Sequence, residues 1–233
     1  MRLTSAILTA LFATLAVLPP AAAACATRGP ALQVAVAERA VARGDWPAAA
    51  AAFGCAAAAS DDAQLAGRAT RAAFEHDQMG AAVRAAGRWV ELEPASEEAR
   101  RYLATALLRR YRTGESITHF AIVLDTAWQD RAEGYTALGA TLGRETNKTG
   151  AARVMERLAE RDAGLAEAQL ARSVLWEQAE HGELALHAAR RALEIRPGWR
   201  MAELAEVRAL LLLGRTDEGL ARAGVLAADG DVL

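Results

Sequence analysis

Small and apolar residues recur at helical spacing between residues 166 and 199. They form two runs separated by a short turn: Ala168, Ala171, Leu175 and Ala179, followed by Ala185, Ala189 and Ala192. Residues three and four apart share one face of a helix, so each run predicts an amphipathic helix. Alanine at the contact lets two helix backbones approach closely, and Pro197 prevents the second helix from continuing. The segment is therefore predicted to form an antiparallel helical hairpin.

The same pattern fills the rest of the chain after residue 29. Glycine or proline marks the turns, as in the sequence GDWP at residues 44–47. We expect helical hairpins at residues 30–43 with 48–59, 63–76 with 79–93, 97–110 with 115–124, 132–144 with 148–161, 166–199, and 200–213 with 217–227. Together they predict an all-α protein.

A nearly constant period runs through these hairpins. A small residue stands near the start of each returning helix, at intervals of 33, 34, 35, 34 and 34 residues: Ala49, Ala82, Ser116, Ala151, Ala185 and Gly219. An apolar residue follows four positions later: Phe53, Ala86, Phe120, Met155, Ala189 and Ala223. This pattern resembles the tetratricopeptide repeat, whose period is about 34 residues. Leu138-Gly139 and the closing sequences ELEP (91–94) and EIRP (194–197) agree with it.

The resemblance implies a right-handed superhelical solenoid of about six antiparallel helix pairs over residues 30–231, with a groove lined by the first helix of each pair. Another α-solenoid repeat is the alternative, because four positions lack the closing proline: Asp61, Trp128, Ala163 and Asp231. More narrowly, residues 65–94 resemble part of the N-terminal region of long tetratricopeptide repeat proteins of the Gram-negative envelope. The family implies a scaffold that binds a protein or peptide partner.

The N-terminus has the composition of an export signal. Arg2 precedes an uncharged run over residues 3–18, which is followed by two prolines and four alanines (residues 19–24). The run is shorter than the roughly 20 residues that span a bilayer, and no later segment resembles a membrane span. We therefore expect residues 1–24 to be a signal peptide, residues 25–29 a short N-terminal segment, and the protein to be exported to the periplasm or the periplasmic face of the outer membrane.

Cys25 directly follows the alanine tract, and three outcomes are open for it. The sequence Ala22-Ala23-Ala24-Cys25 loosely matches a lipoprotein box, which would make Cys25 a lipid anchor. Cleavage after Ala24 by the ordinary signal peptidase would instead leave Cys25 free to pair with Cys55 in an oxidising compartment, and cleavage after Ala26 would remove Cys25. Because the first helix runs antiparallel to the second, residue 30 is expected beside residue 59, which favours the disulfide.

Composition excludes several classes of function. The chain has 27 basic and 29 acidic residues, which argues against a nucleic-acid partner. No glycine-rich phosphate loop is present, and no carboxylate or cysteine stands at metal-ligand spacing from a histidine. The sequence therefore predicts neither an enzyme nor a cofactor or metal site. Solvated positions on helices are expected for all four histidines: His76, His119, His181 and His187.

A row of arginines is the candidate binding surface. Turned away from the returning partner, the first helices are expected to carry Arg71, Phe74, Arg101, Thr105, Arg109, Arg144 and Arg208. Guanidinium groups hold carboxylates through paired hydrogen bonds, so the groove is predicted to bind an extended or helical segment that carries carboxylates. Ion pairs on the first helices themselves are the alternative explanation, since Glu75 and Glu98 lie nearby.

The C-terminal end of the array suggests a second function. After the last hairpin the sequence DGDVL (229–233) provides no polar capping helix, so residues 210–213, four consecutive leucines, are expected in or beside an open end. The alternative to a groove-binding adaptor is therefore a structural subunit that assembles through its convex faces or through this open end, with itself or within a larger complex.

Overall fold

The computed structural model describes residue 25 and residues 28–230, so the predicted signal peptide, including the three alanines of the lipoprotein box, lies outside the described residues. Helices account for most of the described part, which contains no strand. Its twelve helices are α2 (Pro30–Ala42), α3 (Trp46–Ala58), α4 (Ala63–Glu75), α5 (Met79–Leu92), α6 (Glu97–Arg109), α7 (Thr113–Thr126), α8 (Arg131–Leu142), α9 (Lys148–Arg161), α10 (Ala166–Gln178), α11 (Gly182–Ile195), α12 (Arg200–Leu212) and α13 (Thr216–Gly230).

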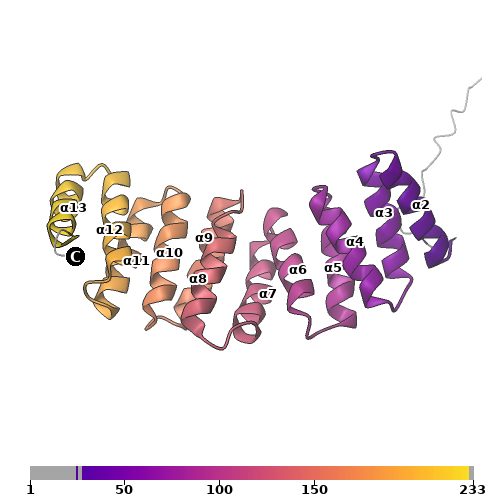
Figure 1. Cartoon of the computed structure of the whole chain (residues 1–233), viewed down its shortest axis with the longest axis horizontal. Coiled ribbons are helices and arrows are strands. Elements are labelled where there is room, and N and C mark those ends of the chain that lie inside the picture. Colours follow the sequence, from indigo (N-terminus) through magenta and orange to yellow (C-terminus); the bar gives the residue numbers. More distant parts are fainter. Residues whose placement is uncertain (1–24, 26–27, 231–233) are drawn as a thin grey trace, which may run out of the picture.

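The helices stand side by side in one elongated row, from α2 at one end to α13 at the other (Figure 1). The even-numbered helices are the first helices of the six pairs, and the odd-numbered helices are the returning ones. Most returning helices pack against their own first helix and against the first helix of the next pair. The predicted all-α solenoid is confirmed. Helix α7 begins two residues earlier and ends two residues later than the predicted range 115–124, and the amide of Ser116 donates to the carbonyl of Arg112, the residue before the helix.

The small residue near the start of each returning helix lies at the closest approach of the pair. Ala82, Ser116, Ala151 and Ala185 are fully buried there. Two serines show how tight this approach is: the Ser116 hydroxyl donates to the carbonyl of Ala104 at 2.8 Å, and the Ser173 hydroxyl donates to the carbonyl of Ala185 at 2.9 Å. The Ser116 hydroxyl reaches from a returning helix to its first helix, and the Ser173 hydroxyl reaches from a first helix to its returning helix. Both bonds confirm the register set by the period.

The pair α8 and α9 packs less closely than the other pairs. Large side chains fill the space between these helices and their neighbours: Tyr135, Leu138, Met155 and Leu158 are almost completely buried. Consequently α9 also packs against α7, and α8 against α10. The interval of 35 residues, one more than the period, falls at this step of the array.

A polar cluster closes this looser junction. Arg131, at the start of α8, forms ion pairs with Asp125 of α7 and with Asp162 at the end of α9. The Tyr135 hydroxyl donates to Asp162 at 2.7 Å, and Arg161 pairs with Asp125 at 3.0 Å. Burial raises the pKa of Asp125, but the hydrogen bonds from the two arginines outweigh it and hold the pKa below its usual value. The cluster therefore ties α7, α8 and α9 together beside the loosely packed pair of α8 and α9.

A disulfide joins Cys25 to Cys55 on α3, with the two Cα atoms 5.0 Å apart. It closes a loop with a sequence separation of 30 residues around the whole of α2. A sulfur that is bonded to Cys55 cannot carry a lipid thioether, so the disulfide and lipidation of Cys25 exclude each other in one molecule.

The last hairpin leaves part of its leucine run exposed. Leu210 is buried, whereas Leu211 and Leu212 are 44% and 42% exposed. Leu213 instead packs against Gly182 at the start of α11. Residues 231–233, the end of the predicted open terminus, lie outside the described part of the chain. Within the described part, each helix is too short or too polar to cross a lipid bilayer.

Candidate functional site

Ion pairs connect the first helices of successive repeats along one face, here named the first-helix face. Glu38 of α2 pairs with Arg68 of α4 at 2.9 Å, and Arg71 of α4 pairs with Glu98 of α6 at 3.0 Å. Further along, the same kind of contact joins Arg109 to Glu145 and Arg208 to Glu177. The arginines of this face are thus held mainly by carboxylates of a neighbouring repeat, which also fixes the spacing between first helices.

Arg109 and Glu145 form the most buried of these pairs. Arg109 donates from Nε at 2.7 Å and from Nη2 at 3.1 Å to the two carboxylate oxygens of Glu145, which follows α8. The side chain of Glu145 is only 7% exposed. The hydrogen bond with Glu145 is the main reason that the pKa of Arg109 is raised above its ordinary value.

Aromatic rings lie between the arginines of α4 and α6. The guanidinium carbon of Arg71 lies 5.2 Å from the ring centroid of Trp89, and that of Arg109 lies 4.3 Å from the ring of Phe74. Tyr102 of α6 contacts both rings, edge-on to Phe74 at 5.1 Å and tilted against Trp89 at 6.3 Å. These five side chains, named the aromatic–arginine cluster, form one continuous contact chain in which each ring has a fixed neighbour.

Two hollows of about 540 Å³ each border this cluster. The first lies at the N-terminal end of α4, where Arg68, Arg71 and Trp89 face Asp62, Glu93 and Glu98. The second lies along the turns between first and returning helices, and its charged lining consists of Arg84, Arg109 and Arg110 with Asp77. Both hollows therefore present groups of both signs beside aromatic or apolar surface.

The predicted site residues fall into three situations. Arg71, Phe74 and Arg109 belong to the aromatic–arginine cluster. Arg101 pairs with Glu97 of its own helix, and Thr105 is almost buried, its hydroxyl donating to the Arg101 carbonyl. Arg144 is exposed, and no carboxylate within residues 28–230 pairs with it, whereas Arg208 lies on α12, far along the array from the cluster.

Trp89 and Tyr102 belong to the cluster and Glu145 pairs with its Arg109, but these three residues were not predicted from the sequence. Trp89 lies on a returning helix and reaches the first-helix face because Gly67 of α4 leaves room for its ring: a Cβ at Gly67 would lie 3.0 Å from the ring. Tyr102 directly follows Arg101 and could have been found from its position in the period. Glu145 stands in a turn, where sequence patterns do not indicate orientation.

Two of the four histidines contact aromatic rings closely. His76 stacks on Trp46 with ring centroids 3.5 Å apart, and His181 meets the edge of Trp176. His119 is partly buried, and its Nδ1 has no hydrogen-bond partner. Only His187 is exposed without a ring contact among the described residues, so the prediction of four solvated histidines is wrong for at least His76 and His119. In the described residues, no three histidine, cysteine or carboxylate side chains are placed to hold a metal ion.

No protein-family model and no curated protein sequence matches the chain. Solved structures with a similar course of the chain include the protein MamA (14% identity, 84% of this chain and 88% of that chain covered, TM-score 0.37). A tetratricopeptide repeat protein from Parabacteroides merdae ATCC 43184 is similar at 10% identity, with 85% and 79% covered and a TM-score of 0.43. YrrB, described as a TPR protein with an unusual peptide-binding site, is similar at 18% identity, with 73% and 88% covered and a TM-score of 0.39.

These similarities are too distant to say anything about partners. The fold itself rests on the paired helices, the buried small residues and their period in this chain. It is a solenoid of the tetratricopeptide-repeat type, as the sequence predicts.

Proposed function

We propose that this protein is a non-catalytic scaffold that binds a segment of a partner protein on the first-helix face of α4 and α6. The aromatic–arginine cluster is the observation that carries the proposal. Trp89 is buried, the other four side chains of the cluster are partly exposed, and the contacts among the five hold them in place beside the two hollows. A surface that is already ordered loses little side-chain entropy on binding, and aromatic and arginine side chains dominate the energy of protein interfaces.

The partner segment is proposed to carry carboxylates. Arg71 donates to Glu98 through Nη1 alone, which leaves the other guanidinium donors for a second carboxylate. Arg101 likewise uses only Nη1 for Glu97, and its side chain is 46% exposed. The pairing within the protein therefore orients these arginines without consuming them.

The protein is further proposed to work outside the cytoplasm, in the periplasm or on the periplasmic face of the outer membrane. The export-type sequence of residues 1–24 and the Cys25–Cys55 disulfide support this location, because disulfides persist in oxidising compartments.

Binding of short peptides of equal length and graded glutamate content, measured by fluorescence anisotropy, tests the groove. We expect affinity to rise with glutamate content and to fall with salt, and the double variant Arg71→Gln/Arg101→Gln to lose most of it. The matched control is Arg157→Gln/Arg191→Gln, which removes two exposed arginines that pair within returning helices. Equal binding by the two double variants would place the binding surface elsewhere. Circular dichroism checks that both remain helical.

A further inference from the structure

The two ends of the helical array expose leucines at positions that are buried or partly buried inside it. Leu32 of α2 is 53% exposed, and Leu220 of α13 is 61% exposed. Among the residues equivalent to Leu32 on later first helices, Ala99, Ala168 and Ala202 are completely buried, and Leu65 of α4 is partly buried. Among the residues equivalent to Leu220 on the other returning helices, Ala50, Ala152 and Leu186 are buried, and Val83 and Ile117 are partly buried. Each end therefore presents one half of a contact that recurs within the array.

The contact that buries these positions joins a returning helix to the first helix of the next repeat, as α11 joins α12. Two pairs of residues fix its register at the turn edge. Trp46 stacks on His76, and a Cβ on Gly182 would lie 2.7 Å from Leu213. Trp46 and Gly182 each stand three positions before the small residue of their own returning helix. Their partners, His76 and Leu213, each stand six positions before the small residue of the next returning helix. The same rule can be applied to the two ends.

Ion pairs mark the centre of this contact in the C-terminal half. Glu156 of α9 pairs with Arg172 of α10 at 2.6 Å, and Arg190 of α11 pairs with Glu206 of α12 at 2.9 Å. The two pairs occupy equivalent positions with the charges exchanged. At the ends, these positions hold Gly224 on α13 and Val36 on α2. A contact between the ends would therefore leave no charge unpaired at its centre, which favours close packing.

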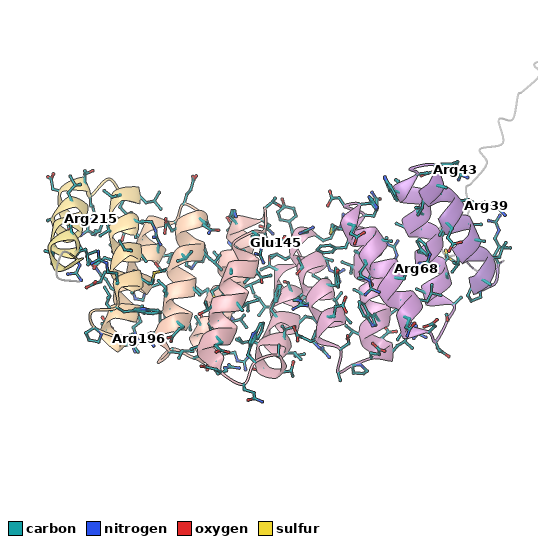
Figure 2. All side chains as sticks on the ribbon, viewed as in Figure 1. Arg39, Arg43, Arg68, Glu145, Arg196 and Arg215 are labelled. Carbon is teal, nitrogen blue, oxygen red and sulfur yellow. A yellow bond between two sulfur atoms is a disulfide. The ribbon has the colours of Figure 1, made fainter. Side chains whose placement is uncertain are left out.

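The turn edge of the same contact has complementary charges. Arg43 takes the position of His76 and Leu213, and within residues 28–227, whose side chains are described, no carboxylate pairs with it. In the register of the pairs Trp46–His76 and Gly182–Leu213, Thr216 would lie opposite Arg43. The exposed Asp217 follows Thr216. Figure 2 shows Arg39 and Arg43 at the α2 end of the molecule and Arg215, beside the start of α13, at the other end. Arg215 is paired with Glu218 at 2.6 Å, so Asp217 remains to meet Arg43.

We propose that α13 of one copy packs against α2 of a second copy, in the register that joins α11 to α12, so that copies associate head to tail. The contact would cover Leu220 and Leu32 together and bring Arg43 beside Asp217. Because the contact joins two different faces, every assembly still has one free α2 face and one free α13 face. Association therefore continues with rising concentration instead of stopping at a dimer. This inference does not depend on the proposed groove.

Size-exclusion chromatography with light scattering, on protein with the disulfide intact, tests the proposal. We expect the mass of the wild-type protein to rise with concentration, and the variants Leu32→Glu and Leu220→Glu each to remain monomeric. An equimolar mixture of the two variants should form dimers and nothing larger, because only one pair of intact faces remains. Leu184→Glu, which changes an exposed leucine of α11 away from both ends, should associate like the wild type.

A charge exchange tests the register. Arg43→Asp should weaken association, and Arg43→Asp/Asp217→Arg in the same chain should restore it. Wild-type protein that stays monomeric over the whole concentration range would overturn the proposal and assign the two faces to another occupant, such as a further segment of this chain or a different protein. Oligomers of fixed size that persist in both leucine variants would also overturn it.

Discussion

Arg109 of α6 holds the buried carboxylate of Glu145 through two hydrogen bonds, although the two residues are 36 positions apart and belong to neighbouring repeats. A carboxylate that is 7% exposed is stable only while its partner is present. The pair therefore contributes to the spacing of α6 and α8 as well as to the charge of the first-helix face.

Arg109→Gln is expected to lower the free energy of unfolding by about 2 to 3 kcal/mol, because it leaves the Glu145 carboxylate buried without its ion pair. The double variant Arg109→Gln/Glu145→Gln should recover much of this loss, since two neutral amides can hydrogen-bond to each other. Urea unfolding followed by circular dichroism measures both. A double variant that is no more stable than Arg109→Gln would show that the pair itself, and not the stranded charge, is responsible.

Reduction of the Cys25–Cys55 disulfide is expected to lower the free energy of unfolding by about 3.5 kcal/mol, from the entropy that a loop of this length regains when it is opened. Cys25→Ser/Cys55→Ser should show the same loss without reductant and no further change when reductant is added. The intact mass of the protein isolated from its source decides whether the disulfide or an acylated Cys25 is present. Two free thiols after export would contradict the disulfide.

His119 is expected to make the protein less stable as the pH falls. Burial, and then the positive charge of Arg100, lowers the pKa of His119 in the folded protein below its ordinary value of 6.5, although Glu115 opposes the shift. The unfolded chain therefore binds the proton first, and stability is lost as the pH falls below 6.5 until it reaches the folded pKa. His119→Gln should remove this slope. His187→Gln, at an exposed position, controls for the loss of a histidine.

The carboxyl group of Asp125 in the polar cluster acts in a separate, more acidic range. The lowered pKa of Asp125 contributes stability that is present above the ordinary value of 3.8 and is lost as the pH falls through the folded pKa. A slope near pH 6 that survives in His119→Gln would therefore show that another group is responsible for it.

Two glycines on neighbouring helices should respond in opposite ways to alanine. At Gly87 of α5 a Cβ would have nothing within 4 Å, so Gly87→Ala should stabilise the protein by up to about 1 kcal/mol through helix propensity. At Gly67 of α4 a Cβ would lie 3.0 Å from the ring of Trp89, which is buried and hydrogen-bonded to Glu93. Gly67→Ala should therefore destabilise by about 1 kcal/mol or more, by overpacking. Thermal unfolding of both variants compares them, and stabilisation by Gly67→Ala would mean that the ring is free to move.

The sequence predicts the fold well, because the array needs only local information. Ala82, Ser116, Ala151 and Ala185 mark the closest approach of each helix pair, and their spacing alone sets the register of the hairpins. The looser packing of α8 and α9 was not predicted. It depends on the combined volume of Tyr135, Met155 and their neighbours, which a pattern of apolar and polar positions does not measure.

The candidate site was predicted in part. The period placed Arg71, Phe74 and Arg109 on one face, but which carboxylate each arginine meets depends on how successive repeats are rotated. Glu98 lies 27 residues from Arg71 and Glu145 lies 36 residues from Arg109, so no single spacing reveals both pairs. The reach of Trp89 from a returning helix depends on the missing side chain of Gly67, which is visible only once the helices are in contact.

The buried apolar residues form one large group from α6 to α12 but three smaller, separate groups between α2 and α6. Helix α6 belongs to both regions, because Leu103 and Leu107 join a group on one side and Ala104 and Leu108 join the large group on the other. Amides of α2 to α5 should therefore exchange with solvent by small, independent openings, whereas those of α8 to α11 exchange only when the large group comes apart as one unit. A ligand that binds α4 and α6 would slow amide exchange in the first region and leave amide exchange in the second region unchanged. Exchange rates along the chain would therefore show where a partner binds.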